Sequence, residues 1–504
     1  MILSRYNLKN ISAQALEVPA ESIFDLPEKV LQFGTGVLLR GLPDYFIDKA
    51  NRQGIFNGRV VVVKSTDSDS SAFDKQDGLY TLCVRGLENG KTVEENIVNS
   101  SISRVLSAKD EWSEILQCAH NPNMQIIISN TTEVGIQLVQ DDIHRLPPVS
   151  FPGKLLAFLL ERYKAFDGSR QSGMVIVPTE LIPDNGKKLE SIVLELAHLN
   201  GLDDNFIQWL ENYNYFCSSL VDRIVPGKPD ATVRENMEKQ FGYKDDLLTM
   251  SEVYRLWAIE GGDHIKSVLT FASVDEGVVI APDINLFREL KLRMLNGTHT
   301  LSCGLAYLGG FGTVKQAMDD ADMQTFIARL MLNEIAAGIP YEVDPGVAQT
   351  FGNKVLDRFA NPNIEHLWIN ITMQYTSKMK MRNVPVILKY VERFKVVPEN
   401  IALGFAAYLL FLKPVKKKQD KFYGEWQGKE YVINDDYAAY FFEKWSKLSP
   451  AQLADEVMAD SALWGADLTA LPGFAQAVKN NLASLIETGV IKTIQIHQTK
   501  KVLA

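Results

Sequence analysis

The chain has 504 residues, of which 46% are hydrophobic and 23% are charged, and these proportions are those of a soluble globular protein. A chain of this length exceeds what one hydrophobic core usually serves, so we expect at least two domains. The formal net charge of -10 disfavours a broad nucleic-acid-binding surface, and small molecules are therefore the expected partners.

The spacing of the cysteines and the shortness of the apolar runs indicate the cellular compartment of the protein. The four cysteines are far apart in sequence and form none of the close pairs typical of zinc or redox sites, so free thiols are expected. The first residues, MILSRYNLKN, contain no apolar run of signal-peptide length. No later stretch approaches the ~20 apolar residues that span a bilayer. These features predict a cytoplasmic protein with no membrane partner.

A dinucleotide-binding turn is predicted near the start of the chain. Lys29-Val-Leu-Gln-Phe33 is typical of a short buried strand, and the glycine-rich Gly34-Thr35-Gly36-Val37 separates it from an amphipathic helix. Gly34 permits a tight turn, and Gly36 lets the backbone approach a pyrophosphate. Leu39 replaces the third glycine of the usual motif, so an ordinary strand-to-helix turn is the alternative. The candidate cofactor contacts are Phe33, Gly34, Thr35, Gly36, Val37 and Arg40.

The second strand suggests where the ribose of a cofactor would bind. Arg59-Val-Val-Val-Val-Lys64 is a continuous β-branched run, which is typical of a parallel strand covered on both faces. An acidic residue after this strand commonly holds the ribose hydroxyls of NAD, and Asp67 is the candidate. Its spacing of 33 residues from Gly34 exceeds the usual ~20, and Asp69 competes with it. A loop that merely caps the strand is the alternative.

A further buried strand, Gln125-Ile-Ile-Ile-Ser129, ends in the polar residues Asn130, Thr132 and Glu133. Ligands of open α/β sheets bind outside the carboxyl ends of the strands, so these side chains are expected on the nicotinamide side of a cofactor. A strand end satisfied by its own loop is equally compatible with the pattern.

The remaining pattern divides the chain into two domains. Strands alternate with helices through about residue 216, with an antiparallel excursion over 77–106, whereas helical periodicity dominates from about 283. We therefore predict an α/β domain with a mostly parallel sheet over 1–282 and an all-helical substrate-binding domain over 283–504. The basic run 413–418 and the segment after it, to Tyr431, are expected to form an exposed loop.

The most chemically loaded stretch is Lys291-Leu-Arg-Met-Leu-Asn296-Gly-Thr-His299, which opens the second domain. On an α-helix, Asn296 would lie about 140° and His299 about 80° round from Lys291, which makes one broad face. An amine, an amide and an imidazole there suit ketone reduction, which needs a proton donor and groups that polarise the oxygen. A solvated lysine and a hydrogen-bonded core histidine are the alternative.

Zinc is the other common route to polarising a ketone, and the sequence offers it little support. No H-x3-5-H pair and no Cys/His cluster occurs. The histidines are scattered along the chain: His120, His144, His198, His264, His299, His366 and His497. A metal-free site is the more economical expectation.

Three motifs together resemble the mannitol dehydrogenase family, the metal-independent long-chain polyol and hexuronate dehydrogenases. They are Gly34-Thr-Gly36-Val-Leu-Leu-Arg40, Val221-Asp222-Arg223-Ile224 and Lys291-x4-Asn296-x2-His299. The second would by itself indicate only a local ion pair. The resemblance implies a Rossmann-type N-terminal domain, NAD as cofactor, Lys291 as general acid/base, and Asn296 and His299 on the substrate oxygen. It also implies substrate contacts by Asp222, Arg223 and Lys378.

The chain departs from the polyol members of this family at two places. Thr179-Glu180-Leu181 stands where they have Cys-Asp-Asn, and Asn370 stands where they have an arginine. Lys378, Lys380 and Arg382 cluster nearby and suit a carboxylate, although a solvent-facing basic loop is the alternative for the last two.

These departures favour a hexuronate substrate. The sequences of residues 129–135 and 178–186 are also similar to those of the hexuronate-reducing members. We expect reversible reduction of tagaturonate to altronate by NADH. Fructuronate, mannitol and mannitol phosphate are alternative substrates of the same family. A catalytically silent NAD-binding regulator is the non-enzyme alternative. The oligomeric state is left open.

Overall fold

The computed structural model describes residues 1–12, 16–67, 69–132 and 134–500. The chain divides into two compact units. The first comprises Met1–Gly86 and Thr92–Ile284, and the second comprises Leu87–Lys91 and Asn285–Ala504. The division after Ile284 lies close to the boundary predicted at Pro282.

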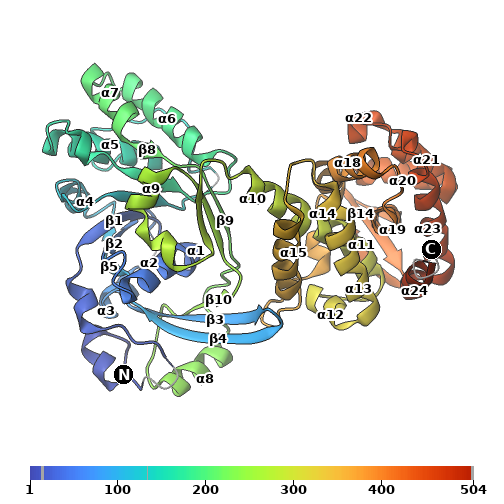
Figure 1. The fold of residues 1–504 in the computed structure, drawn as a ribbon, viewed down its shortest axis with the longest axis horizontal. Helices are drawn as coiled ribbons and strands as arrows, with labels where there is room; N and C mark the ends of the chain where they lie inside the picture. Colours follow the sequence, from blue (N-terminus) through green and yellow to red (C-terminus); the bar gives the residue numbers. More distant parts are fainter. Residues whose placement is uncertain (13–15, 68, 133, 501–504) are drawn as a thin grey trace. The chain divides into compact units, whose positions relative to one another are not determined.

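A six-stranded parallel sheet organises the first unit (Figure 1). Each adjacent pair of its strands is parallel. In chain order its strands take the positions 3-2-1-4-5-6, which is the Rossmann arrangement. The predicted Rossmann-type fold is thus confirmed. The spatial order is β5 (Ile102–Ser107), β2 (Arg59–Lys64), β1 (Glu28–Phe33), β6 (Ile126–Ser129), β7 (Val175–Pro178) and β8 (Tyr215–Phe216).

Both faces of this sheet are buried, which explains the continuous apolar runs of its strands. Side chains alternate along β1, so Leu31 and Phe33 join one hydrophobic cluster and Val30 joins another. Four helices cover the first face: α4 (Trp112–Cys118), α5 (Phe151–Ala165), α6 (Asn185–Leu199) and α7 (Asp204–Tyr213). The helices α1 (Val37–Gly41) and α2 (Pro43–Arg52) contribute to the second cluster.

Two small sheets complete the first unit. One has the order β10-β3-β4, with β3 (Tyr80–Glu88), β4 (Lys91–Asn99) and β10 (Thr249–Glu252). It contains residues 80–99 of the excursion predicted over 77–106, whereas the end of that range belongs to β5 of the parallel sheet. The other has the order β12-β11-β9 and was not predicted; it comprises β9 (Ser219–Asp222), β11 (Leu256–Glu260) and β12 (Val278–Ala281). The unit's further helices are α3 (Ser71–Lys75), α8 (Ala231–Phe241) and α9 (Asp263–Val268).

The second unit is largely helical, which agrees with the predicted all-helical domain except for one small sheet. Its first helices are α10 (Asn285–Glu289), α11 (Thr298–Leu308), α12 (Val314–Asp319), α13 (Ala321–Arg329), α14 (Ala336–Gly338), α15 (Pro345–Phe359), α16 (Trp368–Ile371) and α17 (Tyr375–Lys378). The later ones are α18 (Val384–Phe394), α19 (Glu399–Phe411), α20 (Ala438–Lys447), α21 (Pro450–Ala459), α22 (Ser461–Trp464), α23 (Phe474–Thr488) and α24 (Val490–Lys500). Three π-helical segments join some of these: η5 (Leu290–Gly297), η6 (Leu330–Ile335) and η7 (Met379–Asn383).

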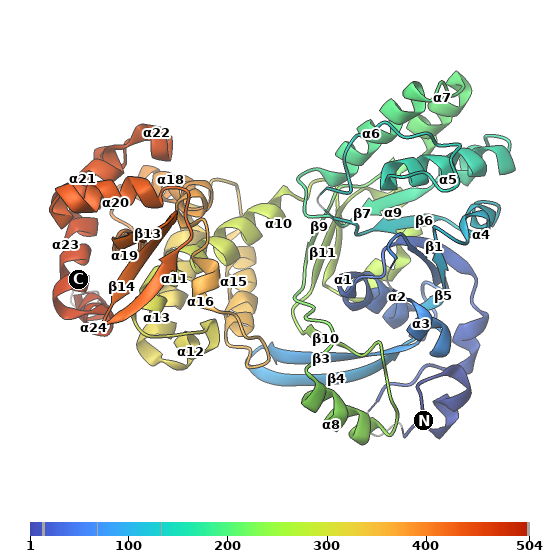
Figure 2. The ribbon, with the colours of Figure 1, turned by 180° about the vertical axis from the view of Figure 1, so that it is seen from behind.

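The exposed loop expected over 413–431 is instead a three-stranded antiparallel sheet (Figure 2). Its strands are β13 (Pro414–Lys418), β14 (Lys421–Trp426) and β15 (Lys429–Ile433). Lys417 and Lys418 are exposed and Lys416 is half-buried, while Tyr431 is buried and its hydroxyl donates to the Phe411 carbonyl at 2.8 Å. The expectation was wrong because a small sheet with one solvent-exposed face has few apolar residues, so its sequence pattern resembles that of a loop.

Two further predictions concern the environment of the chain. The described cysteines Cys83, Cys118, Cys217 and Cys303 are all free and buried, as expected. Throughout the described ranges, every helix is either too short or too polar to cross a bilayer.

Candidate active site

The glycine turn after β1 has the geometry that a dinucleotide site needs. Gly34 has a φ of +129°, and a Cβ there would lie 2.9 Å from the backbone oxygen of Asn130 at the end of β6. Only glycine fits this position. Gly36 is exposed, and a Cβ on it would meet nothing within 4 Å. The turn therefore leaves its backbone at Gly36 open to the close approach of a ligand.

The other predicted residues of this turn differ in exposure. The Phe33 side chain is buried in the core against Phe151, so only its backbone reaches the turn. Thr35 and Val37 are half-buried. The Phe33 carbonyl accepts from the Asn130 backbone N–H at 3.1 Å, which holds the ends of β1 and β6 side by side. A ligand would bind at this point of an open sheet, where the strand order reverses.

Polar residues at the ends of β6 and β7 bond to one another. Asn130 donates its amide to the Thr179 hydroxyl at 3.0 Å. The buried Glu180 carboxylate accepts from the Thr131 backbone N–H at 2.8 Å and from the Ser129 hydroxyl at 3.1 Å. Glu180 thus accepts hydrogen bonds from the end of the neighbouring strand β6, and these partners could not be predicted from its position in the sequence. Thr132 is exposed, and the predicted Glu133 lies outside the described residues.

The two acidic residues after β2 have different partners. Both carboxylate oxygens of Asp69 accept from Ser71, one from its N–H and one from its hydroxyl, each at 2.9 Å. The Asp67 side chain is 85% exposed and pairs with Lys109 at 3.1 Å. An exposed pair of this kind is weak and is easily exchanged for a ligand hydroxyl. The geometry therefore favours Asp67 over Asp69 as a ribose ligand.

Two predicted ligand arginines make interior contacts. Arg40 donates to the Leu247 carbonyl at 2.6 Å. Arg223 donates to the Gly41 carbonyl at 2.6 Å and to the Glu252 carbonyl at 2.9 Å, and burial lowers its pKa to about 10. Both guanidinium groups therefore link α1, the helix after the glycine turn, to β10 and the residues just before it. Asp222, at the end of β9, is buried as well.

The predicted α-helical geometry of the Lys291 stretch is wrong, because residues 290–297 form the π-helix η5 and regular α-helix resumes at Thr298. A π-turn closes its hydrogen bond five residues along instead of four. Lys291 and Asn296 are five residues apart, so they lie about one turn apart on the same side. Both are half-buried. The wider turn of the π-helix therefore places the Lys291 amine and the Asn296 amide more nearly on one face of the helix than an α-helix would.

The third π-helical segment, η7, packs against η5 and is bonded to it directly. Buried Arg293 donates to the carbonyls of Met381 at 2.6 Å and Arg382 at 2.9 Å. In return, Asn383 donates its amide to the Gly297 carbonyl at 3.0 Å. These bonds reach backbone groups at the ends of the two π segments, where the regular α-helical pattern changes. Tertiary contacts of this kind explain why sequence periodicity does not predict π-helix.

His299 follows η5 and is 8% exposed. Its ring stacks on Phe359 with centroids 4.1 Å apart and meets His366 edge-on at 4.9 Å. The pKa of this imidazole is well below its ordinary value, first because the ring is buried. Further lowering comes from the neighbouring basic groups His366, Arg358, Arg382 and Lys378. His299 is therefore neutral, and its buried Nε2 has no hydrogen-bond partner.

Cationic side chains surround this imidazole. Lys378 donates to the Ile371 carbonyl at 3.1 Å, and its pKa is lowered by burial and by Arg382. Arg382 donates to the Thr300 hydroxyl at 3.0 Å, while its buried Nε has no partner. Lys380, by contrast, is exposed. The solvent-facing alternative thus suits Lys380 and does not suit Arg382.

The structure brings together residues that the sequence did not connect. Arg358 and Phe359 end α15, His366 lies in the loop after it, and all three surround His299. Asn383 is a further residue that the sequence did not indicate. Its buried Oδ1 has no hydrogen-bond partner, and the same is true of the buried Nε2 of His299. Within the described ranges, no group of three or more histidine, cysteine or acidic side chains is arranged to hold a metal ion.

The strand order and the glycine turn define the first unit as a Rossmann-type dinucleotide-binding fold, and a separate helical unit carries a neutral imidazole, an amine and an amide. Residues 28–270 match the profile of the mannitol dehydrogenase Rossmann domain, and residues 283–486 match that of the mannitol dehydrogenase C-terminal domain. The chain belongs to the mannitol dehydrogenase family. The predicted resemblance is confirmed.

Similar proteins include an altronate oxidoreductase from Bacillus subtilis (strain 168), which is 38% identical over 93% of this chain and 95% of its own length. One from Pectobacterium carotovorum is 36% identical over 93% and 96%. Among solved structures, a mannitol 2-dehydrogenase from Pseudomonas fluorescens, in a ternary complex with NAD and D-mannitol, has a TM-score of 0.65 and 22% identity over 99% of this chain and 100% of that one. A D-sorbitol dehydrogenase in substrate-free form has a TM-score of 0.77 and 20% identity over 98% and 100%.

Proposed function

We propose that this protein is an NAD-dependent reductase of a hexuronate ketone that converts tagaturonate to altronate reversibly. The observation that carries the proposal is the neutral His299 among the cationic Lys378, Arg382 and Arg358, because a sugar acid needs both a polarising group and a cation. The altronate oxidoreductases that it resembles along nearly their whole length support this substrate class.

NAD is the cofactor that the first unit fits best. Gly34 and Gly36 would accept the pyrophosphate, Asp67 the ribose hydroxyls, and Asn130 and Thr132 the nicotinamide end. An exposed carboxylate such as Asp67 favours NAD over NADP, because it would repel the phosphate of the latter. When bound, the reduced cofactor supplies the hydride that the reaction needs.

The chain's own residues would manage the proton and the developing negative charge. Lys291, as an ammonium ion, gives its proton to the ketone oxygen, and the neutral amine takes it back in the reverse direction. Asn296 and His299 donate hydrogen bonds to the same oxygen. A neutral imidazole suits this role because it polarises the oxygen without competing with Lys291 for the proton transfer.

The carboxylate of the substrate would pair with Lys378 and Arg382. Arg382 lies four residues after Lys378, so the two cations come from neighbouring turns of one helical segment. Asn370, which stands where polyol members have arginine, is exposed. Asp222 is a further candidate substrate contact, and Arg223 is a positioning residue that holds the end of β9 on the end of α1 through the Gly41 carbonyl.

Steady-state oxidation of NADH with tagaturonate, fructuronate and fructose in parallel tests this proposal. We expect the highest kcat/KM with tagaturonate and a much lower value with neutral fructose. A higher kcat/KM with fructuronate or with fructose would show that this compound, and not tagaturonate, is the substrate. The absence of NADH oxidation with all three ketones, and of NAD reduction with mannitol phosphate, would favour a silent NAD-binding regulator.

Gly34→Ala should abolish NADH binding, because its Cβ would collide with the Asn130 backbone at 2.9 Å and the backbone conformation disfavours a side chain. Gly54→Ala is the matched control, since Gly54 also has a positive φ, of +67°, but a Cβ there would meet nothing within 4 Å. Titration by NADH fluorescence, with circular dichroism to check folding, measures both. Equal affinity in the two variants would refute the assignment of this turn.

Asp67→Ala should weaken NADH binding about tenfold and narrow the preference over NADPH, because one charge-assisted pair of ribose hydrogen bonds is lost. Asp69→Ala serves as the comparison, since Asp69 is engaged by Ser71. Dissociation constants for both cofactors decide between them. If only Asp69→Ala changes the preference, the ribose ligand is Asp69.

We further propose a cytoplasmic location. Four free, buried thiols persist most readily in a reducing compartment, and a sugar acid reductase that uses NADH draws on an intracellular cofactor pool.

A further inference from the structure

Two of the π-helical segments of the second unit, η5 and η7, bond to each other's backbone in both directions. From η5, Arg293 donates to the Met381 carbonyl at 2.6 Å and to the Arg382 carbonyl at 2.9 Å. From η7, Asn383 donates its side-chain amide to the Gly297 carbonyl at 3.0 Å. These three bonds are called the π-helix clamp below. Each of the two segments fixes the backbone of the other through this clamp.

A proline explains why a carbonyl of η7 is open to a side chain of η5. In a regular α-helix the N–H of residue 385 would bond to the Met381 carbonyl, but Pro385 has no N–H. Its ring also crowds the carbonyl four residues earlier, and helical geometry commonly changes at such positions. Arg293 supplies the missing donor. Its guanidinium group is buried and pairs with Glu289 at 2.9 Å, so it is held in place.

Asn383 uses only the donor half of its side-chain amide. The side chain is fully buried, and its Nδ2 bonds to the Gly297 carbonyl. Its Oδ1 has no hydrogen-bond partner among the residues that the structure describes. An unpaired buried oxygen lowers the stability of the fold. Natural proteins tolerate such conflicts chiefly at functional sites, so the Asn383 bond is a candidate for a role in the reaction.

The clamp acts on the backbone next to Asn296. Gly297 follows Asn296 directly, and a Cβ on this glycine would lie 3.4 Å from the Asn383 Nδ2. The Asn296 carbonyl is bonded as well, because it accepts from the Thr300 hydroxyl at 2.8 Å and from Arg382 at 3.5 Å. Side chains therefore hold two consecutive carbonyls, and this fixes the direction in which the Asn296 side chain leaves the helix.

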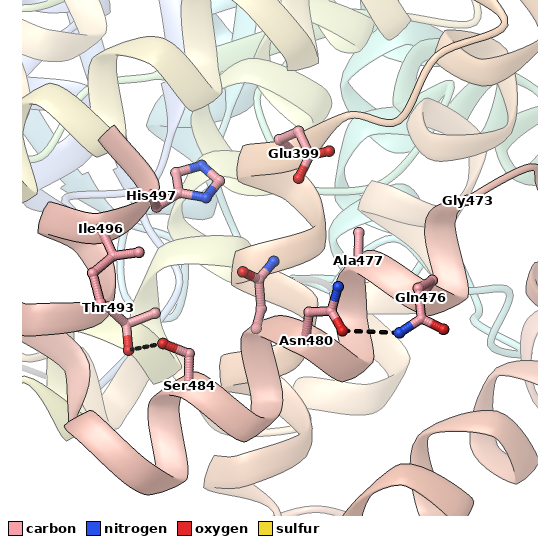
Figure 3. A pocket seen from close by; sticks show the side chains of 10 residues that line it. Glu399, Gly473, Gln476, Ala477, Asn480, Ser484, Thr493, Ile496 and His497 are labelled. Atoms are coloured by element: carbon pink, nitrogen blue, oxygen red, sulfur yellow. Dashed lines mark hydrogen bonds between the residues drawn. The ribbon is translucent and has the colours of Figure 1, made fainter. Parts of the chain in front are cut away.

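The remaining π-helical segment, η6, has a different use. Its buried Glu334 accepts from the backbone N–H groups of Asn400 at 3.0 Å and Ile401 at 2.9 Å, and so caps the start of α19. That start, at Glu399, borders a pocket among α19, α23 and α24 (Figure 3). The described residues that line this pocket include none of the candidate active-site residues. Glu334 therefore supports the packing of α19, whereas the π-helix clamp reaches a residue assigned to the reaction.

We propose that Asn383 is a positioning residue that acts through Gly297 and directs the Asn296 amide at the ketone oxygen. This rests on the proposed role of Asn296 at that oxygen. With the clamp intact, Asn296 shares one side of η5 with Lys291; without the Asn383 bond, the turn relaxes and the amide is displaced. A donor aimed at developing negative charge loses much of its effect when it is displaced by about 1 Å.

A double-mutant cycle between Asn383→Leu and Asn296→Ala tests this proposal. The quantity measured is kcat/KM for whichever of tagaturonate, fructuronate and fructose the wild-type chain reduces fastest. Asn296→Ala should lower it about 10²- to 10³-fold, as the loss of one oxyanion donor does. Asn383→Leu should lower it about 10- to 100-fold in the wild-type background, chiefly through kcat. In the Asn296→Ala background the same change should matter less than about twofold, because residues that act as a unit are not additive.

Asn51→Leu is the matched control for a bond that is only structural. Asn51 is a buried asparagine of the other unit, and its amide donates to the Gly58 carbonyl at 2.8 Å. Whatever factor this change costs should be the same in both backgrounds. Thermal unfolding followed by circular dichroism checks the folding of each variant. Asn383→Ala, whose smaller side chain cannot clash, replaces Asn383→Leu in the cycle if the latter does not fold.

Failure of the positioning role and failure of the proposed function give different results. Equal factors for Asn383→Leu in the two backgrounds, or no loss in the wild-type background, overturn the positioning role and leave that of Asn296 intact. A loss with hexuronates that is absent with fructose would place the effect on Arg382, and it also overturns the positioning role. Wild-type turnover in Asn296→Ala, or no reduction of any of the three ketones by the wild-type chain, would overturn both.

Discussion

Lys291→Ala is expected to lower kcat for hexuronate reduction about 10²- to 10⁴-fold, the usual contribution of a positioned general acid. The affinity for NADH should change little, because the glycine turn that would bind it belongs to the other unit. Both quantities are accessible from steady-state kinetics and a fluorescence titration. The reverse reaction, oxidation of altronate, should lose a similar factor, because the same nitrogen then acts as the base.

Two controls separate proton transfer from other effects of this substitution. Lys389→Ala removes a lysine on α18 that pairs with Glu392 at 3.0 Å, and it should leave kcat unchanged. Small primary amines added to Lys291→Ala should restore part of the activity, with an effect that follows the amine's pKa. Unchanged turnover in Lys291→Ala would remove the lysine from the mechanism.

The sheet of the first unit was predictable because its strands have an unambiguous pattern. The β-branched run 59–64 and the isoleucines of 126–128 are too short for a helix and too apolar for a loop. The glycine turn was equally visible, since Gly34 must adopt a positive φ. Strands of the β9–β12 region escaped prediction because several have only four residues and alternate with loops.

The candidate active site was predictable only in part. Local spacing indicated Lys291, Asn296 and His299, but it gave them α-helical positions, whereas η5 is a π-helix held by cross-bonds from η7. Arg358 and His366 reach His299 from elements more than fifty residues away, so no local pattern connects them. Tertiary packing decides which of these distant residues meet. The sequence therefore predicts the reacting side chains better than the neighbouring residues that shift their pKa values.

Arg382→Met is the second substitution with a large expected effect. It should lower kcat/KM for tagaturonate about 10²- to 10³-fold, because truncating one partner of a buried charged pair costs about 3 kcal/mol or more. Activity with neutral fructose should fall far less, since that substrate has no carboxylate. Steady-state kinetics with both substrates measure this ratio, and Arg382→Lys should recover part of the hexuronate preference by restoring the charge.

Thr300→Val is the matched control for this prediction. Arg382 donates to the Thr300 hydroxyl at 3.0 Å, so Arg382→Met removes both a charge and a structural hydrogen bond. Thr300→Val keeps the guanidinium group and removes this bond together with the one that the Thr300 hydroxyl donates to the Asn296 carbonyl at 2.8 Å. If Thr300→Val reproduces the loss, the hydrogen bonds of Thr300 account for it and the Arg382 charge does not. If both substrates lose activity equally in Arg382→Met, the arginine does not bind the carboxylate, and Lys378 becomes the remaining candidate of the two.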